Sequence, residues 1–240
     1  MNKAGYKRAA IIALAGALLI ILTLLLPEVW MRYLYNRTIG RFFRHSVESR
    51  LQSFGNEARK RLQLAYQPYQ LVIIALKSEK RLELWGQDTN GKPFFIKSYP
   101  ILAASGTAGP KLREGDRQVP EGFYSIESQH PNSNFYLALK IAYPSPDDIK
   151  IALAEKRDPA GLGSNIMLHG KGGSVGCISV DNPAMEEIFY LANLVKTENI
   201  SVLIMPCDFR KNPLPVVQKD WLQKRYQKLS REVKKYEKAQ

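Results

Sequence analysis

Short apolar runs recur along the middle of the chain and are separated by turn residues. Runs of this length, rich in β-branched and aromatic residues, are typical of strands. Between the last two runs, Asn182 as N-cap and Pro183 at the first helical position predict one helix with an apolar inward face. The pattern predicts a strand-rich, mixed α+β domain with a curved or sandwiched sheet and one or two helices. The predicted strands are 71–76, 81–85, 94–104, 123–128, 135–142, 165–169, 177–180 and 200–205.

The N-terminal part has a different pattern. Residues 9–26 are apolar apart from Gly16 and Thr23, and they follow a short basic stretch, residues 1–8. These 18 residues are at the short end of the length that spans a bilayer. Bulky aromatics, and no small-residue cleavage site, come next, so we predict an uncleaved transmembrane signal anchor with residues 1–8 in the cytoplasm. The basic segment 27–68 has apolar residues at helical spacing and is expected to form a juxtamembrane helical stalk.

The C-terminal segment, residues 211–240, follows the predicted strand-rich domain, residues 69–210. Its apolar residues alternate at spacings of four and three, and Lys and Arg fill most other positions, which predicts a basic amphipathic helix. Such a helix could pack on the domain, lie on anionic lipid or pair with a partner helix. With fewer than three heptads, a solvated terminal helix is favoured. The apolar positions are Leu222, Tyr226, Leu229, Val233 and Tyr236.

The formal net charge of +13 would suit a nucleic-acid binder. However, the sequence contains no recognised nucleic-acid motif, and its basic residues are concentrated outside the middle domain. Other anionic polymers, or acidic lipid headgroups, are a sufficient target for this charge. We therefore predict no nucleic-acid partner.

The candidate chemistry lies between two apolar runs. His169 closes the first run, a glycine-rich loop follows, and Cys177 opens the second. If the runs are neighbouring antiparallel strands, opposed Cβ atoms lie about 5 Å apart. That distance would let the imidazole take a proton from the thiol and make a nucleophile at neutral pH. Gly176 leaves the backbone N–H groups of Gly176 and Cys177 open to a substrate oxygen, as an oxyanion hole.

This stretch also has other interpretations. A buried free cysteine and a hydrogen-bonded histidine are common in protein cores. The loop lacks the Gly-Lys-Ser/Thr ending of a phosphate-binding loop, and Val175 stands where a dinucleotide fingerprint needs its last glycine. One histidine and one cysteine eight residues apart lack the paired-ligand spacing of a zinc site. No metal and no organic cofactor are predicted.

The motif Ser174-Val175-Gly176-Cys177, with His169-Gly170 upstream, resembles the active-site signature of the L,D-transpeptidase (YkuD-type) catalytic domain. A second block, residues 105–124, is similar to the Gly-Asp…Thr-Pro-Glu-Gly-Tyr segment of that family, in the form of its YafK-like branch. The resemblance covers about residues 71–209 and implies the same mixed fold. It implies that Cys177 is the nucleophile and His169 the general base. We further expect Ser174, Lys171 and Ser179 to contact substrate.

The resemblance implies an enzyme that acts on peptidoglycan stem peptides. The thiolate would attack the carbonyl of the third-position diamino acid and form a thioester. An amine would then resolve the thioester by transpeptidation, or water by hydrolysis. Because peptidoglycan lies outside the inner membrane, the expected location is a single-pass inner-membrane protein with its catalytic domain in the periplasm. A disulfide between the two cysteines would consume the nucleophile, so Cys207 is expected to be structural.

Two positions depart from most of the family. Val175 stands where a histidine usually precedes the Gly-Cys pair, and Ser179 stands where cross-linking members carry an arginine. Both departures are shared with the YafK-like branch, which includes an enzyme that detaches Braun lipoprotein from peptidoglycan. The alternative function is therefore a hydrolase that releases such a lipoprotein or trims stems. A catalytically silent peptidoglycan-binding domain is a more remote alternative.

Overall fold

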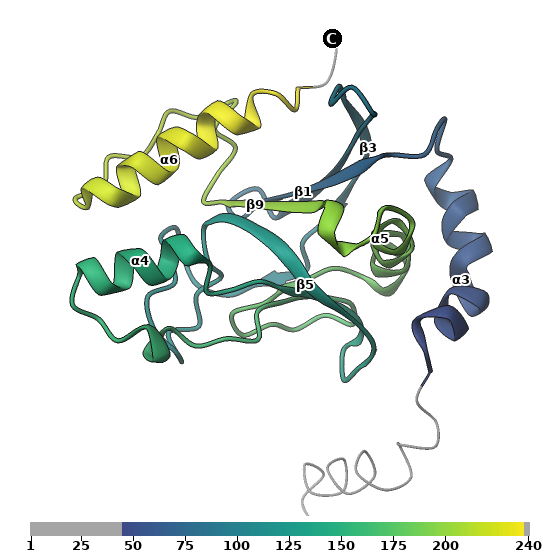
Figure 1. Ribbon diagram of the computed structural model, residues 1–240, viewed down its shortest axis with the longest axis horizontal. Coiled ribbons are helices and arrows are strands. Elements are labelled where there is room, and N and C mark those ends of the chain that lie inside the picture. The colour runs from purple at the N-terminus through teal and green to yellow at the C-terminus, as the bar shows by residue number, and fades with distance from the viewer. Residues whose placement is uncertain (1–44, 238–240) are drawn as a thin grey trace, which may run out of the picture. The chain divides into compact units, whose positions relative to one another are not determined.

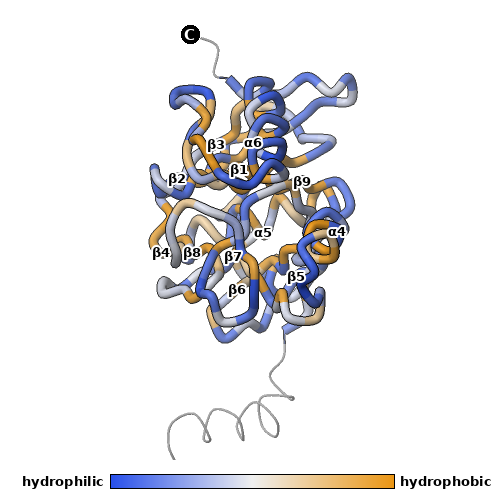
Figure 2. The backbone as a smooth tube through the Cα atoms, turned by 90° about the vertical axis from the view of Figure 1, so that its left-hand side faces the viewer, coloured by the Kyte–Doolittle hydropathy of each residue, from blue (hydrophilic) through white to orange (hydrophobic). Residues whose placement is uncertain are grey.

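A mixed sheet organises residues 45–237, the part of the chain that this computed structural model describes (Figure 1). Among these residues the sheet has nine strands in the order β3-β2-β1-β9-β5-β6-β7-β8-β4. Figure 2 shows β6, β7, β8 and β4 following one another toward one edge. The strands are β1 (Gln70–Leu76), β2 (Arg81–Gln87), β3 (Pro93–Pro100), β4 (Ala103–Ala104), β5 (Gly122–Ser133), β6 (Tyr136–Ile141), β7 (Met167–His169), β8 (Ile178–Ser179) and β9 (Ile200–Met205).

Most neighbouring strands run antiparallel, but β1 pairs with β9 and β7 pairs with β8 in parallel. β1 and β9 are buried along almost their whole length, which fits their continuous apolar sequences. The side chains of β1 alternate between two cores. Leu71, Ile73 and Ala75 belong to one core, and Val72, Ile74 and Leu76 belong to the other.

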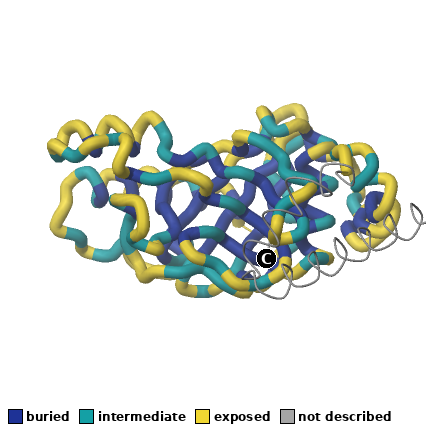
Figure 3. Tube along the Cα trace, turned by 90° about the horizontal axis from the view of Figure 1, so that it is seen from below, coloured by how far each residue is buried: buried dark blue, intermediate teal, exposed yellow. Residues whose placement is uncertain are grey.

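Four α-helices and two short 3₁₀ helices complete the described residues. Helix α5 packs in the first core, and α6 covers β1 and β9 from the opposite side (Figure 1). Figure 3 shows the buried backbone in the middle of the described residues and the exposed backbone around it. The helices are α3 (Val47–Leu62), α4 (Pro146–Ala154), η2 (Pro159–Leu162), α5 (Asn182–Val195), η3 (Thr197–Asn199) and α6 (Asp220–Val233).

Local signals explain where α4 and α5 begin. Asp181, one residue before the predicted N-cap, caps α5 by accepting the backbone N–H of Ala184. Ser145 and Asp148 form a reciprocal capping box at the start of α4. The apolar pattern did not predict α4, because the helix is short and only Asp148 and Ala152 of its residues are buried.

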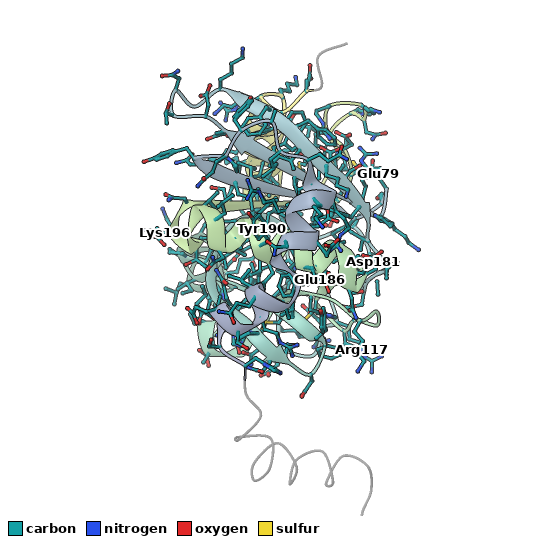
Figure 4. All side chains as sticks on the ribbon, turned by 90° about the vertical axis from the view of Figure 1, so that its right-hand side faces the viewer. Glu79, Arg117, Asp181, Glu186, Tyr190 and Lys196 are labelled. Carbon is teal, nitrogen blue, oxygen red and sulfur yellow. The ribbon has the colours of Figure 1, made fainter. Side chains whose placement is uncertain are left out.

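Helix α3 packs on α5. Its Phe54 ring meets the edge of Phe189 at a centroid distance of 6.3 Å. Near its C-terminal end, Arg61 pairs with Glu186 and Glu187 of α5 at 2.7 and 2.8 Å. Figure 4 shows α5 behind α3 and labels Glu186 where the two helices lie side by side. The helix expected within 27–68 is therefore joined to the sheet through α5.

The C-terminal helix α6 is not solvated, so that interpretation of the sequence was wrong. The five apolar residues predicted for this segment, four in α6 and Tyr236 just beyond it, are all buried and pack on the face of β1 that carries Val72 and Ile74. Arg225 is also buried and pairs with Asp147 and Asp148 at 2.8 Å. The apolar face of α6 covers the side of the sheet that carries Val72, Ile74 and Leu76 of β1, because these side chains would otherwise be exposed.

The predicted fold class needs correction in two respects. Four α-helices are present where one or two were predicted, since α3 and α6 also contact the sheet on which α5 packs. The predicted transmembrane helix, residues 9–26, lies outside the described residues. Between residues 45 and 237, no helix is both long and apolar enough to cross a bilayer. The longest, α3, has 16 residues, four of them buried, whereas a span needs about 20 apolar residues. The described residues therefore do not bear out the predicted single-pass inner-membrane location.

Candidate active site

The two strands next to the predicted catalytic residues, β7 and β8, run parallel, not antiparallel as expected. The register pairs His169 of β7 with Ser179 of β8. Cys177 immediately precedes β8 and lies about 7 Å along the chain from the position opposite His169, given a rise of about 3.3 Å per residue. Parallel neighbours usually need a connection of a dozen or more residues. The short loop 170–177 carries the chain back to the start of β8, with positive φ angles at Lys171, Gly172, Gly173 and Gly176.

The Cys177 thiol is half-buried against the backbone that leads into β7. Its Sγ accepts the Met167 N–H at 3.4 Å, and the thiol donates to the carbonyl of Asn165 at 3.7 Å. Burial raises the pKa of the Cys177 thiol, and the Met167 N–H and the charge of Lys111 oppose that rise only in part. The resting group is therefore a thiol, whereas the sequence had suggested a thiolate at neutral pH.

His169 is almost fully buried, with 1% of its surface exposed. Its Nδ1 lies 2.7 Å from the carbonyl oxygen of Gly170. A carbonyl only accepts, so Nδ1 carries the hydrogen and Nε2 is the basic nitrogen. Burial lowers the pKa of His169 more than the Gly170 contact raises it, so the ring is neutral at neutral pH. Among the described residues, no hydrogen bond joins this ring to Cys177.

Phe135 is a residue at this site that the sequence did not reveal. It lies between β5 and β6, is 45% exposed, and covers the His169 ring at a centroid distance of 4.5 Å and an interplanar angle of 31°. An exposed aromatic at a hairpin tip is the only signal that could have marked it, because the contact links positions 34 residues apart. The ring limits water access to the imidazole.

Gly176 holds the position next to the nucleophile in a conformation that favours glycine, with φ of 84°. Its N–H is not open as predicted, because it donates to Ser105 Oγ at 2.5 Å. The Ser105 hydroxyl in turn donates to the carbonyl of Arg117 at 2.7 Å. A substrate oxygen would have to displace the Ser105 hydroxyl in order to use this N–H.

The three predicted substrate contacts occupy different environments. Ser174 Oγ donates to the carbonyl of Cys177 at 2.5 Å and so closes the loop around the nucleophile. Ser179 is fully buried, and its hydroxyl has no partner among the described residues. Lys171 is exposed at the top of the loop. Only Lys171 presents its side chain to solvent beside the site.

A cavity of about 280 Å³ opens beside the nucleophile. Its walls come from residues 111–117, from 163–166 and from Val175-Gly176. The first wall is held by Asp116, whose carboxylate accepts the N–H groups of Leu112, Arg113 and Gln118 and pairs with Lys111 at 2.7 Å. The sequence marked this block only through its family resemblance, because its contacts with the loop are long-range.

Cys207 forms no disulfide with Cys177, and both cysteines are free. No cluster of three or more His, Cys, Asp or Glu residues suitable for a metal ion occurs in the described range. The chemistry available at the site is that of a half-buried thiol, a neutral imidazole and a backbone N–H held by a serine hydroxyl.

The family model for the YkuD L,D-transpeptidase catalytic domain matches residues 70–204. The "Putative L,D-transpeptidase YafK" of Escherichia coli strain K12 is 35% identical over 122 residues, which are 50% of this chain and 46% of that protein. The protein of the same name from Escherichia coli O157:H7 matches with the same identity and coverage. The chain thus spans about half the length of the curated relatives it matches.

Two solved structures are similar in outline. The helical cell shape determining protein Pgp2 of Campylobacter jejuni has a TM-score of 0.46 at 20% identity, with 64% of this chain and 55% of that chain covered. Bd1075 of Bdellovibrio bacteriovorus has a TM-score of 0.40 at 26% identity, with 69% and 56% covered.

Proposed function

Because the chain belongs to the YkuD-type L,D-transpeptidase catalytic domain family, as its matching residues 70–204 show, we propose that it is a cysteine acyltransferase that acts on peptidoglycan stem peptides. Cys177 attacks the carbonyl of the third-position diamino acid and forms a thioester. The observation that carries this proposal is the half-buried Cys177 thiol beside a cavity, preceded in β7 by a neutral His169.

The proton balance favours general-base catalysis over a resting ion pair. Burial disfavours both the thiolate and the imidazolium, so the proton leaves Cys177 as the sulfur attacks. His169 Nε2 accepts that proton and returns it to the leaving amine. The thiol must first leave its contact with Asn165, which requires a rotation about the Cα–Cβ bond of Cys177. Catalytic hydrogen bonds are often incomplete without substrate.

The backbone N–H of Gly176 is the proposed oxyanion donor. Ser105 Oγ holds it in the free protein, and a developing negative charge is a stronger acceptor than a neutral hydroxyl. Exchanging one acceptor for the other therefore favours the transition state over the ground state. One such donor contributes about 3 kcal/mol to barrier lowering.

Hydrolysis is the second candidate, and Ser179 is the observation that favours it. Cross-linking relatives carry an arginine at this position, whereas here a fully buried hydroxyl presents no charge to a donor or an acceptor. Water at about 55 M resolves a thioester unless an amine is bound and oriented. We propose a hydrolysis-biased partition, in which peptidoglycan-linked lipoprotein is one candidate leaving group.

Liquid chromatography of muropeptides tests the function. The full chain is incubated with tetrapeptide and lipoprotein-linked muropeptides, with Cys177→Ala as the matched inactive control. Tripeptide stems should accumulate with the native chain only. Abundant 3–3 cross-links without an increase in tripeptides would make the protein a transpeptidase, and no product from any stem would reject the proposed enzyme.

A further inference from the structure

The exposed side of α6 carries a row of cations. The apolar side chains of this helix are buried against β1 and β9 (Figure 1). Because an α-helix has about 3.6 residues per turn, the exposed residues Lys224, Lys228 and Arg231 lie on the opposite side of α6. Lys234, which is also exposed, continues the row just past the last turn. At a rise of about 1.5 Å per residue, the row is about 15 Å long.

None of these four cations has an ion-pair partner among residues 45–237. Three other cations in and around the same helix do have one, because Lys219, Arg225 and Lys235 each pair with a carboxylate. Asp220 is exposed at the first turn, so it does not balance the charge of the rest of the row. Like charges three or four residues apart on a helix repel one another. An anion bound to this face would therefore remove a cost that the free protein bears.

The sheet and the end of α4 hold the backbone of α6 in place. Near the first turn, Trp221 Nε1 donates to Glu155 at 2.9 Å. Beyond the last turn, Gln87 donates to the Tyr236 hydroxyl at 2.8 Å. Between these contacts, the apolar side chains of the helix are buried. The row of cations is thus presented by a fixed element, so binding has to order only the side chains.

The residues around the cations decide which kind of partner fits. Helices that lie on a bilayer insert apolar side chains such as Trp, Phe or Leu beneath the headgroups. The apolar side chains of α6 are already buried against the sheet, and the exposed residue between Lys224 and Lys228 is Gln227. Binding through this face is therefore electrostatic, and it suits a hydrated polyanion better than a bilayer. Peptidoglycan is such a polymer, because its stem peptides carry free carboxylates.

We propose that the exposed face of α6, defined by Lys224, Lys228, Arg231 and Lys234, is a docking surface for peptidoglycan strands, which it binds through the carboxylates of their stem peptides. This inference rests on the proposed function, because it takes the polymer substrate as the partner. None of the four cations lines the cavity beside Cys177. The face therefore sets the affinity for the polymer, whereas turnover of a short soluble fragment does not depend on it.

Co-sedimentation of the full chain with purified sacculi measures the docking. The assay is done in a Cys177→Ala background, so that the polymer is not cut. Binding should weaken as NaCl is raised, because salt screens exposed charges. The α6 variant, which combines Lys224→Gln, Lys228→Gln, Arg231→Gln and Lys234→Gln, should raise the Kd for sacculi about tenfold or more. With Cys177 restored, it should keep the native melting temperature and the native kcat/KM on a soluble tetrapeptide donor.

A scattered variant is the matched control, because it removes the same number of positive charges from other exposed positions. These positions lie on different parts of the fold, and none of their side chains forms an ion pair within the described residues. The control should bind sacculi with close to native affinity. Its substitutions are Arg59→Gln, Lys92→Gln, Lys150→Gln and Lys196→Gln.

Native-like sacculus binding by the α6 variant would overturn the docking surface. An equal loss in the scattered variant would also overturn it, because net charge alone would then account for binding. Binding of the native chain to vesicles of phosphatidylglycerol and phosphatidylethanolamine, without binding to sacculi, would overturn it in favour of a membrane surface. Failure of the native chain to cleave the soluble donor would reject the proposed function alone, since the comparison of sacculus binding requires no turnover.

Discussion

The two ends of the sheet are built in different ways. Toward one end, β1, β2 and β9 are six or seven residues long, pair in regular register and are buried on both faces. Toward the other end, β7, β8 and β4 have three, two and two residues and are joined by loops with positive φ angles. The long strands form the regular part of the sheet. The predicted nucleophile and base lie at the other end, where the strands are short.

The charged side chains under α6 and those at the cavity also differ, in whether they have partners. Under α6, Glu121 is fully buried and has partners for both oxygens, Lys77 at 2.8 Å on one and Tyr226 on the other. At the cavity beside Cys177, the side chains of Glu114 and Arg117 form no ion pair among the described residues. Charges with partners contribute to the fold, whereas charges without partners at a cavity remain free to bind a ligand. The predictions that follow separate these two roles.

The largest effect on stability is expected at Glu121. Glu121→Ala leaves the Lys77 ammonium buried without its carboxylate and should lower the free energy of unfolding by about 4 kcal/mol. Chemical denaturation measures this loss. Glu57→Ala, which removes the partner of Lys60 in an exposed pair, should change little. Equal losses in the two variants would remove the distinction between framework and surface charges.

A smaller loss in the free energy of unfolding is expected from a substitution in α6. Leu229 is fully buried in the second core, so Leu229→Ala should cost about 3 kcal/mol through lost contacts and the cavity left behind. Lys228→Ala, at the adjacent exposed position, is the control and should be close to neutral. A neutral Leu229→Ala would mean that α6 does not cover the sheet in solution.

At the irregular end of the sheet, stability should respond less than activity. Gly176→Ala places a side chain at φ of 84°, which costs about 1 kcal/mol in unfolding free energy. Turnover should fall much further, because the N–H next to the nucleophile shifts. Gly161→Ala meets nothing within 4 Å and serves as the control for both assays. Native turnover in Gly176→Ala would show that this conformation does not matter for catalysis.

The smallest expected effect is a shift in the pH dependence of thiol alkylation and of turnover. Burial raises the pKa of Cys177, so its iodoacetamide alkylation rate should inflect above the ordinary thiol value. Burial lowers the pKa of His169, so turnover should persist below the ordinary histidine value of about 6.5 and fail as the ring takes a proton. A thiol inflection below its ordinary value would instead indicate a resting thiolate–imidazolium pair.

The regular end of the sheet could be predicted from sequence, and much of the site could not. Continuous apolar runs identify β1 and β9 because both faces of these strands are buried. The parallel pairing of β7 with β8 depends on how far the loop turns, and Lys171 carries no signal for its positive φ of 62°. The contacts of Phe135 with His169 and of Ser105 with Gly176 join distant segments, so no local pattern encodes them.

The central claim is that Cys177 carries the acyl group, and intact mass spectrometry tests it most directly. The full chain is incubated with a carbapenem, whose strained lactam is an acyl donor, and the adduct is located by peptide mapping. One adduct on Cys177 is expected in the native chain and in Cys207→Ser. Cys177→Ala should show no adduct and no turnover, with a nearly unchanged melting temperature. An adduct or native turnover in Cys177→Ala would contradict the account.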